Sequence, residues 1–433
     1  MSNMFQKRRM ILAKKMAPNA ICLVESGLLK MRNNDVAYTF RPNSSFYYLT
    51  GYKNPNSVLL IYRGKSCYEE IIFVRKPNEF DEIWNGKLPT SSEVSKKFVI
   101  KKCDYISNLE SVLKVYLEKS KSLYHSLDEN SQSLLLVKSI INELQSNYRR
   151  GTSSPSQIFS LDTLVNEMRL IKDVNEIKAM KHAAKISANA HINLMKKCKP
   201  GMTEKDIETE LRYYFNTNRS VEAYPSIVAS GKNSCVLHYI DNNDVMKKED
   251  LLLTDAACEY NFYASDITRT IPVSGVFTPP QKEIYDIVLN AQKKAIGKCM
   301  PGVTLSQIHR EAVKWISKGL ISLGLVKADL TKVIKEELYK PFYMHNTGHW
   351  LGLDVHDPLP YKISKRNIIL KPGMTFTVEP GIYIKPKKNI PKKYHNIGIR
   401  IEDDILITKN GCEVMTSAVP KSTQEIEKIM SQS

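Results

Sequence analysis

A near-repeat in the second half of the chain constrains the fold more than any other sequence feature. The segment KCKPGMTEKDI begins at Lys197, and KCMPGVTLSQI begins 101 residues later, at Lys298. In both copies a helical pattern is followed by a Pro-Gly break, a capping threonine (Thr203 or Thr304) and a second amphipathic helix. The shared pattern predicts two similar halves that face each other across a cleft, where ligands commonly bind.

The N-terminal part of the chain has a different pattern. Strand-like runs at 58–62 and 69–76 alternate with helical spacing, and a Ser-rich stretch at 149–157 is the expected linker. A chain of 433 residues exceeds the usual size of a single core. We therefore predict a smaller α/β domain over residues 1–165 and a larger α+β domain over residues 166–433.

The composition is that of a soluble globular protein, with 42% hydrophobic and 25% charged residues. The sequence has no apolar run of about eighteen residues, as a membrane-spanning helix requires. Its eight cysteines form no CxxC pair, which favours reduced thiols in the cytoplasm over a zinc ribbon or a disulfide framework. The basic N-terminus is expected to be the first helix of the fold, with a mitochondrial presequence as the alternative. The net charge of +18 is dispersed, without a nucleic-acid motif, so no nucleic-acid or membrane partner is expected.

Two aspartates occupy a predicted hairpin in LLLTDAACEYNFYASDITRTIPV. If the turn centres on Tyr260 and Asn261, Asp255 and Asp266 lie directly opposite each other on one face. Like charges in that position, roughly 5 Å apart, destabilise a hairpin. Either a cation lies between them or one carboxyl group is protonated. A different register, with both aspartates solvated, is the alternative.

Two glutamates stand in strand-like runs near the C-terminus. In GMTFTVEPGIYI, Glu379 lies on the opposite face from Phe376 and Val378, just before a Pro-Gly turn. In GIRIEDDILIT, Arg400 and Glu402 share one face. An unpaired buried carboxylate is costly, so each glutamate needs either a salt-bridging partner or a bound metal ion.

The histidines are clustered, because His345, His349 and His356 all fall within HNTGHWLGLDVHDP in a chain with nine histidines. Such a cluster indicates metal binding or proton transfer. One histidine nitrogen together with the carboxylates forms a mainly oxygen ligand set that suits Mn²⁺, Co²⁺ or Zn²⁺. A helical HExxH zinc site, a GxSxG nucleophile elbow and a GxxxxGK[ST] phosphate loop are all missing from the sequence.

Taken together, these segments closely resemble aminopeptidase P, the Xaa-Pro aminopeptidase group of the pita-bread metallopeptidases. The metal-binding motifs of that family are similar, in order, to DAACEYNFYASDITRT, HNTGHWLGLDVHD, TVEPGIYI and GIRIEDDILIT. Its upstream histidine segment is similar to YPSIVASGKNSCVLHY, and its first domain to FRPNSSFYYLTGY and EIWNGK. The resemblance covers nearly the whole chain and implies a pseudo-symmetric pita-bread catalytic domain.

The resemblance also implies a pair of divalent metal ions, usually manganese. Their ligands would be Asp255, Asp266, His349, Glu379 and Glu402, with Asp266 and Glu402 bridging. A water molecule between two such ions would become the attacking hydroxide, and Glu379 is placed to take its proton.

The resemblance implies roles for further residues. Substrate positioning and stabilisation of developing charge are expected from His238, His345 and His356. Arg400 is expected to orient Glu402 or Asp255 by a charged hydrogen bond. The proline pocket is expected to include His345, Trp350 and Tyr383. Trp84 resembles a residue that reaches the site of a neighbouring subunit, which implies a homo-oligomer, either a dimer or a tetramer.

The activity that the resemblance implies is removal of the first residue from peptides with proline in second position. A prolidase restricted to dipeptides and an organellar processing aminopeptidase of the same fold are alternatives. A metal-free relative that binds nucleic acid or protein is disfavoured, because all five ligand positions are kept. Asn346 and Ala257 depart from the usual motifs without replacing a ligand.

Overall fold

The computed structural model describes residues 2–127 and 131–432 of the chain. Two compact units divide between Met168 and Arg169. The predicted linker at 149–157 is wrong, because this stretch lies inside the first unit. It leads into β8 (Gln157–Ser160), which pairs with β7 (Ser122–His125) in the main sheet. The boundary between the units falls later, at the end of α7 (Leu161–Arg169).

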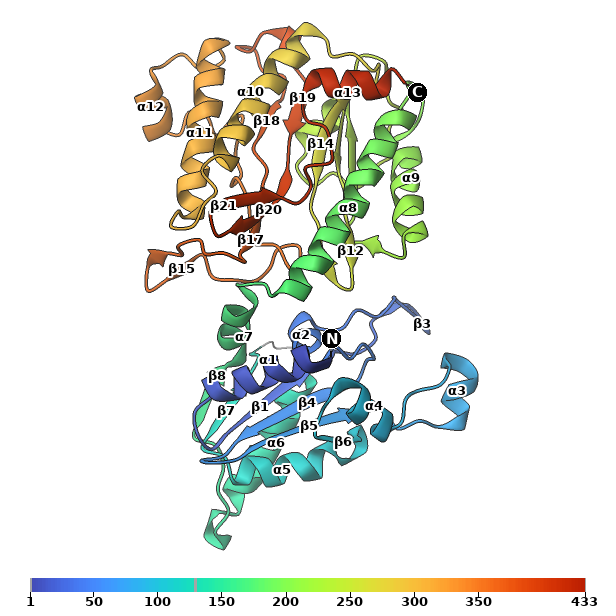
Figure 1. Ribbon diagram of the computed structural model, residues 1–433, viewed down its shortest axis with the longest axis vertical. Helices are drawn as coiled ribbons and strands as arrows, with labels where there is room; N and C mark the ends of the chain where they lie inside the picture. Colours follow the sequence, from blue (N-terminus) through green and yellow to red (C-terminus); the bar gives the residue numbers. More distant parts are fainter. Residues whose placement is uncertain (1, 128–130, 433) are drawn as a thin grey trace. The chain divides into compact units, whose positions relative to one another are not determined.

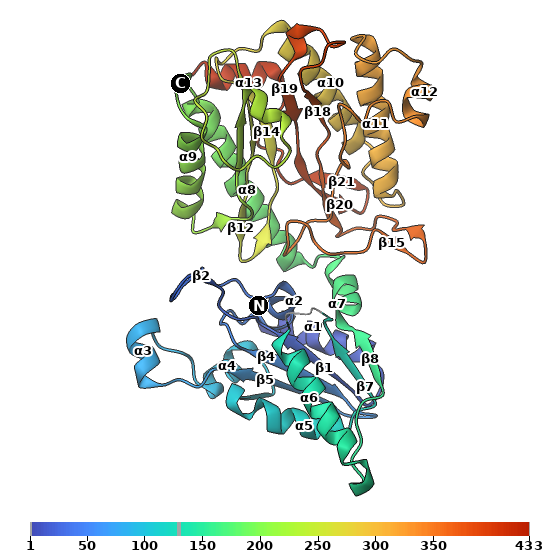
Figure 2. The same ribbon diagram turned by 180° about the vertical axis from the view of Figure 1, so that it is seen from behind.

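The first unit is built on a six-stranded mixed sheet in the order β6-β5-β4-β1-β7-β8. Its other strands are β1 (Ala20–Glu25), β2 (Met31–Asn33), β3 (Val36–Ala37), β4 (Val58–Arg63), β5 (Tyr68–Val74) and β6 (Lys102–Tyr105). Its other helices are α1 (Ser2–Lys15), α2 (Ser44–Thr50), α3 (Glu79–Asn85), α4 (Ser91–Phe98), α5 (Leu109–Glu118) and α6 (Gln132–Ser146). Helix α1 covers one face of the sheet (Figure 1), and α5 and α6 cover the other (Figure 2). The expected first helix and the strands predicted at 58–62 and 69–76 are confirmed.

The core of the first unit lies between the sheet and the helices α5 and α6. Ile21 and Leu23 of β1 and Phe73 of β5 pack there against Leu113 and Ile140 of the two helices, and all five side chains are at most 2% exposed. Burying side chains of this kind stabilises a fold by about 1.5–3 kcal/mol each, before the entropy cost is counted.

The second unit contains the predicted pair of helix-break-helix segments. Its helices are α8 (Val174–Lys197), α9 (Glu204–Thr217), α10 (Pro279–Ile296), α11 (Leu305–Ser322), α12 (Leu330–Lys335) and α13 (Thr423–Met430). Thr203 begins α9 and Thr304 begins α11, each as part of a capping box with the residue three positions later. The repeat therefore marks equivalent helix starts in the two halves, as predicted. Helices α8 and α9 flank one side of the strands, and α10 and α11 flank the other (Figure 1).

The strands of the second unit form several small antiparallel ladders. The ladders that carry the site are β10-β11-β14, β17-β20-β21 and β18-β19. Their strands are β10 (Ile227–Ser230), β11 (Leu251–Asp255), β14 (Thr268–Pro272), β17 (Thr375–Val378), β18 (Gly381–Ile384), β19 (Ile397–Arg400), β20 (Asp403–Thr408) and β21 (Gly411–Val414). The remaining strands are β9 (Val221–Glu222), β12 (Cys258–Tyr260), β13 (Tyr263–Ala264), β15 (Lys362–Ile363) and β16 (Arg366–Asn367).

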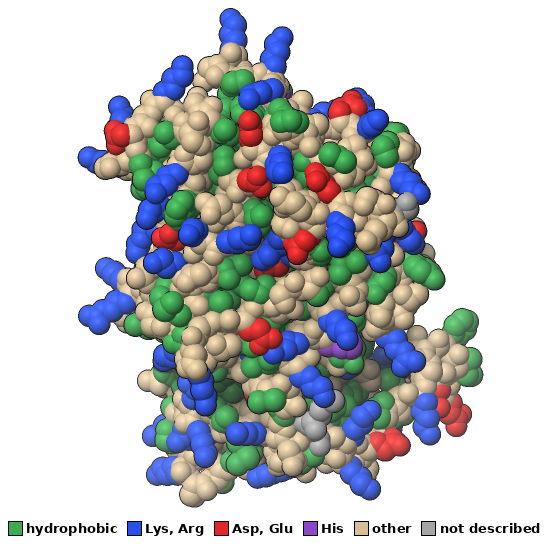
Figure 3. Space-filling view, turned by 45° about the horizontal axis from the view of Figure 1, so that its top comes forward, with side chains coloured by type: hydrophobic (Ala, Val, Ile, Leu, Met, Phe, Trp, Pro, Cys, Tyr) green, Lys and Arg blue, Asp and Glu red, His purple; other side chains and the backbone are tan. Residues whose placement is uncertain are grey.

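The basic side chains do not gather in one place on the face drawn in Figure 3, where lysines and arginines are spread among acidic and apolar groups. In the described part of the chain, no helix is both long enough and apolar enough to cross a membrane.

Candidate metal centre

The two hairpin aspartates lie on one face, but in a different register from the one predicted. Asp255, at the end of β11, pairs with Thr268 rather than with Asp266. The turn lies one residue later than expected, since Tyr260 pairs with Tyr263. A one-residue shift of the turn moves each partner by two residues, which keeps both aspartates on the same face because side chains alternate along a strand. Neither aspartate is solvated, because their side chains are 13% and 7% exposed.

The hydroxyl group of Tyr224 joins the two aspartates. Its oxygen lies 2.7 Å from Asp255 Oδ1 and 2.6 Å from Asp266 Oδ1. A phenol has one proton, so it donates to one of these carboxylates at a time, and the other needs a further proton or a cation. Burial, and then the charges of the two aspartates, raise the pKa of Tyr224 well above its ordinary value. The sequence reasoning missed this residue, although it stands in the YPSIVASG segment that supports the resemblance.

The two glutamates stand at one end of the β17–β20 ladder. Val378 is the last residue of β17 and pairs with Asp403, the first residue of β20. Glu379 directly follows Val378 and Glu402 directly precedes Asp403, so the ladder places the two glutamates side by side. Thr268 of β14 donates its hydroxyl to Glu402 Oε2 at 2.7 Å, and its carbonyl oxygen accepts from the Glu402 backbone N–H at 3.1 Å. These bonds tie the two ladders together at the site.

The loop that carries His349 is attached to β17. The backbone N–H of His349 donates to Thr377 Oγ1 at 3.1 Å, and its carbonyl oxygen accepts from the Thr377 N–H at 2.9 Å. Gly348 allows this close approach, because a Cβ atom there would lie 1.9 Å from the Thr377 carbonyl oxygen. His349 Nδ1 lies 3.1 Å from the carbonyl oxygen of Trp350, to which it donates. The Nε2 atom is therefore the nitrogen that faces the acids.

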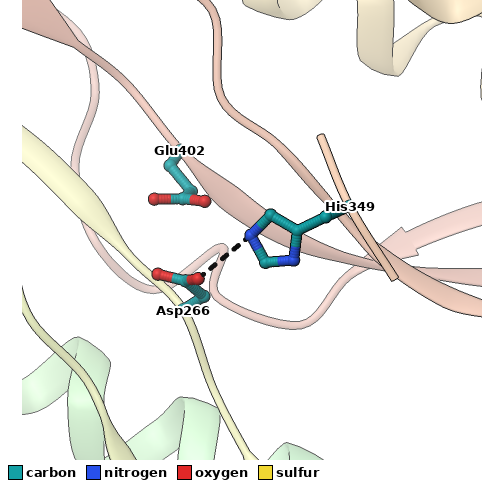
Figure 4. Close-up of side chains that lie close together, drawn as sticks. All are labelled: Asp266, His349 and Glu402. Atoms are coloured by element: carbon teal, nitrogen blue, oxygen red, sulfur yellow. Dashed lines mark ion pairs between the residues drawn. The ribbon is translucent and has the colours of Figure 1, made fainter. Parts of the chain in front are cut away.

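All five predicted ligands lie together, and we call them the acidic cluster: Asp255, Asp266, His349, Glu379 and Glu402. Ligand atoms of Asp266, His349 and Glu402 lie within 4.8 Å of one another (Figure 4). His349 Nε2 is 3.4 Å from Asp266 Oδ2 and 3.6 Å from Glu379 Oε1. Burial lowers the pKa of His349, but these carboxylates outweigh it and raise the pKa to about 9.

The acidic cluster has more negative charge than the protein itself balances. Burial, followed by repulsion from Asp266, Glu379 and Asp255, raises the pKa of Glu402 well above its ordinary value. Burial also raises the pKa of Glu379, to about 7. The guanidinium group of Arg400 pairs with Asp255, Nη2 to Oδ2 at 2.6 Å. Four buried carboxylates beside one arginine, with a histidine nitrogen facing them, are a donor set that fits hard or borderline divalent metal ions.

Arg400 also begins a chain of hydrogen bonds that leads to His345. Its Nη1 atom donates to the hydroxyl oxygen of Tyr383 at 3.0 Å, and that hydroxyl lies 2.9 Å from His345 Nε2. His345 Nδ1 lies 2.8 Å from the carbonyl oxygen of Asn346. Burial lowers the pKa of His345 to about 4, so the ring is neutral at pH 7, with Nδ1 donating and Nε2 accepting. Tyr383 thus links the arginine to the histidine.

The remaining two predicted histidines border the acidic cluster. The ring of His356 meets that of His349 edge to face, with the ring centres 4.2 Å apart. His238 is exposed, and it contributes to lowering the pKa of both His345 and His356, so it lies near them. All four predicted site histidines therefore gather around one region of the second unit.

The two predicted tryptophans differ in their surroundings. Trp350 is 1% exposed, packs against Phe376, and donates its indole N–H to the carbonyl oxygen of Pro360 at 3.1 Å. The indole is therefore largely a core side chain, and its expected role in the proline pocket stays a prediction. Trp84 lies on α3 of the first unit with 73% of its surface exposed, and its predicted contact with substrate stays a prediction.

Comparison with known proteins identifies the same two parts of the chain. Residues 178–409 match the model of metallopeptidase family M24, and residues 5–124 match the aminopeptidase P N-terminal domain. The Xaa-Pro aminopeptidase of Haemophilus influenzae is 40% identical over 427 residues, which cover 98% of this chain and 96% of that protein. The structure of the Pseudomonas aeruginosa aminopeptidase PepP matches with a TM-score of 0.97 at 40% identity, covering 100% of this chain and 98% of that one. A structure described as zinc-substituted Escherichia coli aminopeptidase P in complex with product matches with a TM-score of 0.97 at 38% identity, covering 100% and 98% of the two chains.

Proposed function

Because the chain belongs to metallopeptidase family M24 and carries an aminopeptidase P N-terminal domain, we propose that it is an Xaa-Pro aminopeptidase. It removes the first residue from peptides whose second residue is proline. The observation that carries this proposal is the convergence of four carboxylates and His349 in one buried cluster with an excess of negative charge. The near full-length similarity to Xaa-Pro aminopeptidases supports the substrate class.

We propose that the acidic cluster would hold two divalent ions. Manganese is the expected ion, and cobalt or zinc are the alternatives. When bound, such ions supply Lewis acidity and lower the pKa of water. Arg400 holds Asp255 in place, and the Tyr224 hydroxyl fixes the spacing of the two aspartates.

We assign the uptake of a proton and the delivery of a proton to different residues in and around the acidic cluster. Glu379 receives a hydrogen bond from Thr377 Oγ1 to its Oε1 atom at 3.3 Å, which orients the carboxylate. Its Oε2 atom lies 3.8 Å from His345 Nδ1. We assign to Glu379 the role of proton acceptor. His356 and His238 are the candidates for stabilising the oxyanion and delivering a proton to the leaving nitrogen.

The leaving nitrogen explains why recognition relies on shape. An Xaa-Pro bond is a tertiary amide without an N–H group, so a site cannot select it by accepting a backbone hydrogen bond. The ring of His345 lies next to Glu379 and is tilted by 57° against the ring of Tyr383, with the ring centres 5.6 Å apart. We propose that they contact the proline ring, and that Trp84 of a neighbouring subunit contributes in a homo-oligomer. Light scattering measures the oligomeric state directly.

The decisive experiment combines metal analysis with peptide cleavage. Protein purified with manganese present is expected to retain close to two ions per chain and to release Xaa from an Xaa-Pro-Yaa tripeptide. Cleavage of an Xaa-Pro dipeptide alone would support a prolidase, and equal cleavage of Xaa-Ala-Yaa would support a processing aminopeptidase. Protein that binds no divalent ion and cleaves none of these peptides would contradict both the metal site and the proposed function.

A further inference from the structure

Two cysteines outside the acidic cluster lie side by side at the C-terminal end of α10. Cys299 Sγ lies 3.4 Å from the carbonyl oxygen of Ala295, and Cys412 Sγ lies 3.7 Å from that of Ile296. These two oxygens belong to consecutive residues in the last turn of the helix. Both cysteines also pack in one hydrophobic cluster. The fold thus brings together two thiols that are far apart in the sequence.

The proximity of the two thiols gives them different acidities. Cys299 lowers the pKa of Cys412 to about 7, against the effect of burial, and Cys412 together with burial raises the pKa of Cys299 well above its ordinary value. Cys412 is half-buried, whereas Cys299 is 3% exposed. Cys412 is therefore the thiol that a small oxidant reaches, and Cys299 lies next to it, covered by the protein.

Cys103 is also half-buried, and it shows that partial exposure alone does not lower the pKa of a thiol. Burial and the charge of Asp104 raise the pKa of Cys103 to about 12, so at neutral pH it is a protonated, weakly reactive thiol. Cys67 is exposed, in the β4–β5 turn of the first unit. Cys412 differs from both because a second thiol stabilises its thiolate.

We propose that Cys299 and Cys412 are an oxidation site, which hydroperoxides convert to a reversible intrachain disulfide. The Cys412 thiolate attacks one oxygen of hydrogen peroxide, so that an S–O bond forms, the O–O bond breaks and hydroxide leaves. The hydroxide takes up the proton that the Cys412 thiol released and becomes the first water. Cys299 then attacks the sulfenic sulfur, so that the S–S bond forms and the S–O bond breaks. The Cys299 proton goes to the departing hydroxide, and a second water is released. Two thiols and one peroxide give one disulfide and two waters, and a dithiol reductant reverses the change.

The disulfide would connect α10 to the ladder that leads to the acidic cluster. Cys412 lies on β21 opposite Ile407 of β20, the strand that begins directly after Glu402. The bond would close a loop of about 110 residues, a length at which a cross-link restricts the unfolded chain strongly. Oxidation is therefore expected to raise the thermal unfolding midpoint of the second unit, by at least about 3 °C.

The test treats the full-length protein with hydrogen peroxide, quenches it with catalase and alkylates the free thiols under denaturing conditions. In a Cys67→Ser background, which removes the exposed thiol, mass spectrometry is expected to show the loss of two alkylatable thiols per monomer. Digestion is expected to yield one cross-linked peptide containing Cys299 and Cys412. Dithiothreitol should restore both thiols and return the unfolding midpoint to its starting value.

Single-cysteine variants distinguish the cysteine that reacts with peroxide from the cysteine that then forms the disulfide. In Cys299→Ala, peroxide should leave a sulfenic acid on Cys412 that dimedone traps, because the second thiol is gone. In Cys412→Ser, Cys299 should stay reduced, and the unfolding midpoint should not rise. The proposal is overturned if both cysteines of the unmutated pair stay alkylatable after peroxide treatment. It is also overturned if Cys412 alone is oxidised while Cys299 remains a free thiol.

Discussion

Glu402 and Asp403 are neighbours in sequence and both are buried, yet their charges are balanced in different ways. The Asp403 side chain is 0% exposed and pairs with Arg269 at 2.7 Å and with Lys421 at 2.6 Å. Gln292 and Thr416 donate two further hydrogen bonds to its carboxylate, at 2.7 and 2.8 Å. Burial alone would raise the pKa of Asp403, but the two cations hold it below its ordinary value.

Glu402 has a hydrogen bond from Thr268 but faces other carboxylates, and its pKa is raised well above the ordinary range. Asp404, the next residue, is bonded by neutral donors, Ser265 Oγ at 2.6 Å and the Asp266 N–H at 3.0 Å. The comparison separates a carboxylate whose charge the protein itself balances from one that we propose is balanced by bound metal ions. Acidic composition alone does not distinguish them, because both stand in the same EDD run.

The largest expected effect comes from the acidic cluster itself. Asp266→Asn and His349→Ala should each lower kcat/KM on an Xaa-Pro-Yaa peptide by at least about 10³-fold, because each removes a ligand. The protein should stay folded, with an unfolding midpoint within a few degrees of wild type, since asparagine keeps the shape of aspartate and neither substitution removes an apolar core side chain. Steady-state kinetics and circular dichroism measure the two quantities.

The matched control is His182→Ala, which changes an exposed histidine on α8. It should leave kcat/KM within about twofold of wild type. Turnover that is unchanged in Asp266→Asn or in His349→Ala would refute the assignment of ligands.

The second prediction concerns stability instead of activity, because Arg269 balances the buried charge of Asp403. Arg269→Met should destabilise the protein by about 3–5 kcal/mol, since it leaves a buried carboxylate without its main partner. Urea unfolding measures this loss. The control is Lys181→Ala, which breaks an exposed pair with Glu413 and should cost no more than about 1 kcal/mol. If the two substitutions lower the unfolding free energy by the same amount, the buried Arg269–Asp403 pair does not have the structural role assigned to it.

The third prediction concerns a second balanced carboxylate, Asp357. Burial alone would raise its pKa, but Lys172 and Arg169 lower it below the ordinary value. A carboxylate with a lowered folded pKa stabilises the protein above its unfolded pKa and loses this contribution as the pH falls through the folded pKa. Asp357→Asn should therefore destabilise the protein most near pH 7, by about 2–4 kcal/mol.

Below about pH 4 the difference in unfolding free energy between Asp357→Asn and wild type should shrink. Unfolding curves at pH 7, 5, 4 and 3 measure this trend. A difference that is constant over this range would show that Asp357 contributes through packing rather than charge.

The smallest of these effects is expected at Tyr224, which contacts two ligands without being one. Tyr224→Phe keeps the ring but removes the hydroxyl that lies between Asp255 and Asp266. Manganese affinity should fall by about 10–100-fold, with little change in stability. Metal titration followed by activity measures the affinity, and the exposed Tyr213→Phe is the control. Wild-type affinity in Tyr224→Phe would mean that the aspartates keep their spacing without the phenol.

The sequence was sufficient for the helices that begin at strong local signals. The threonines at 203 and 304 cap α9 and α11 as predicted, because capping depends on residues only three positions apart. The linker at 149–157 was mispredicted, since its serines and Pro155 resemble a flexible connection. Pairing of β8 with β7, a contact across more than thirty residues, decides its place.

The predicted ligands came together for a similar reason, although one register was wrong. The face of a strand depends on the alternation of neighbouring residues, so an error of two in the partner of Asp255 left its face unchanged. Tyr224 and Arg269 were missed because their roles depend on contacts with distant strands. The burial of Trp350 was not predicted, since a position next to a ligand in sequence does not determine whether a side chain points to solvent or to the core.

The close contact at Gly348 determines where this site is able to change. Any side chain at 348 would collide with the carbonyl oxygen of Thr377, so His349 would lose its attachment to β17. Asn346, two residues earlier, is exposed and has room for larger or smaller groups. Residue 346 can therefore vary without disturbing the attachment of His349, whereas residue 348 accepts no amino acid with a side chain.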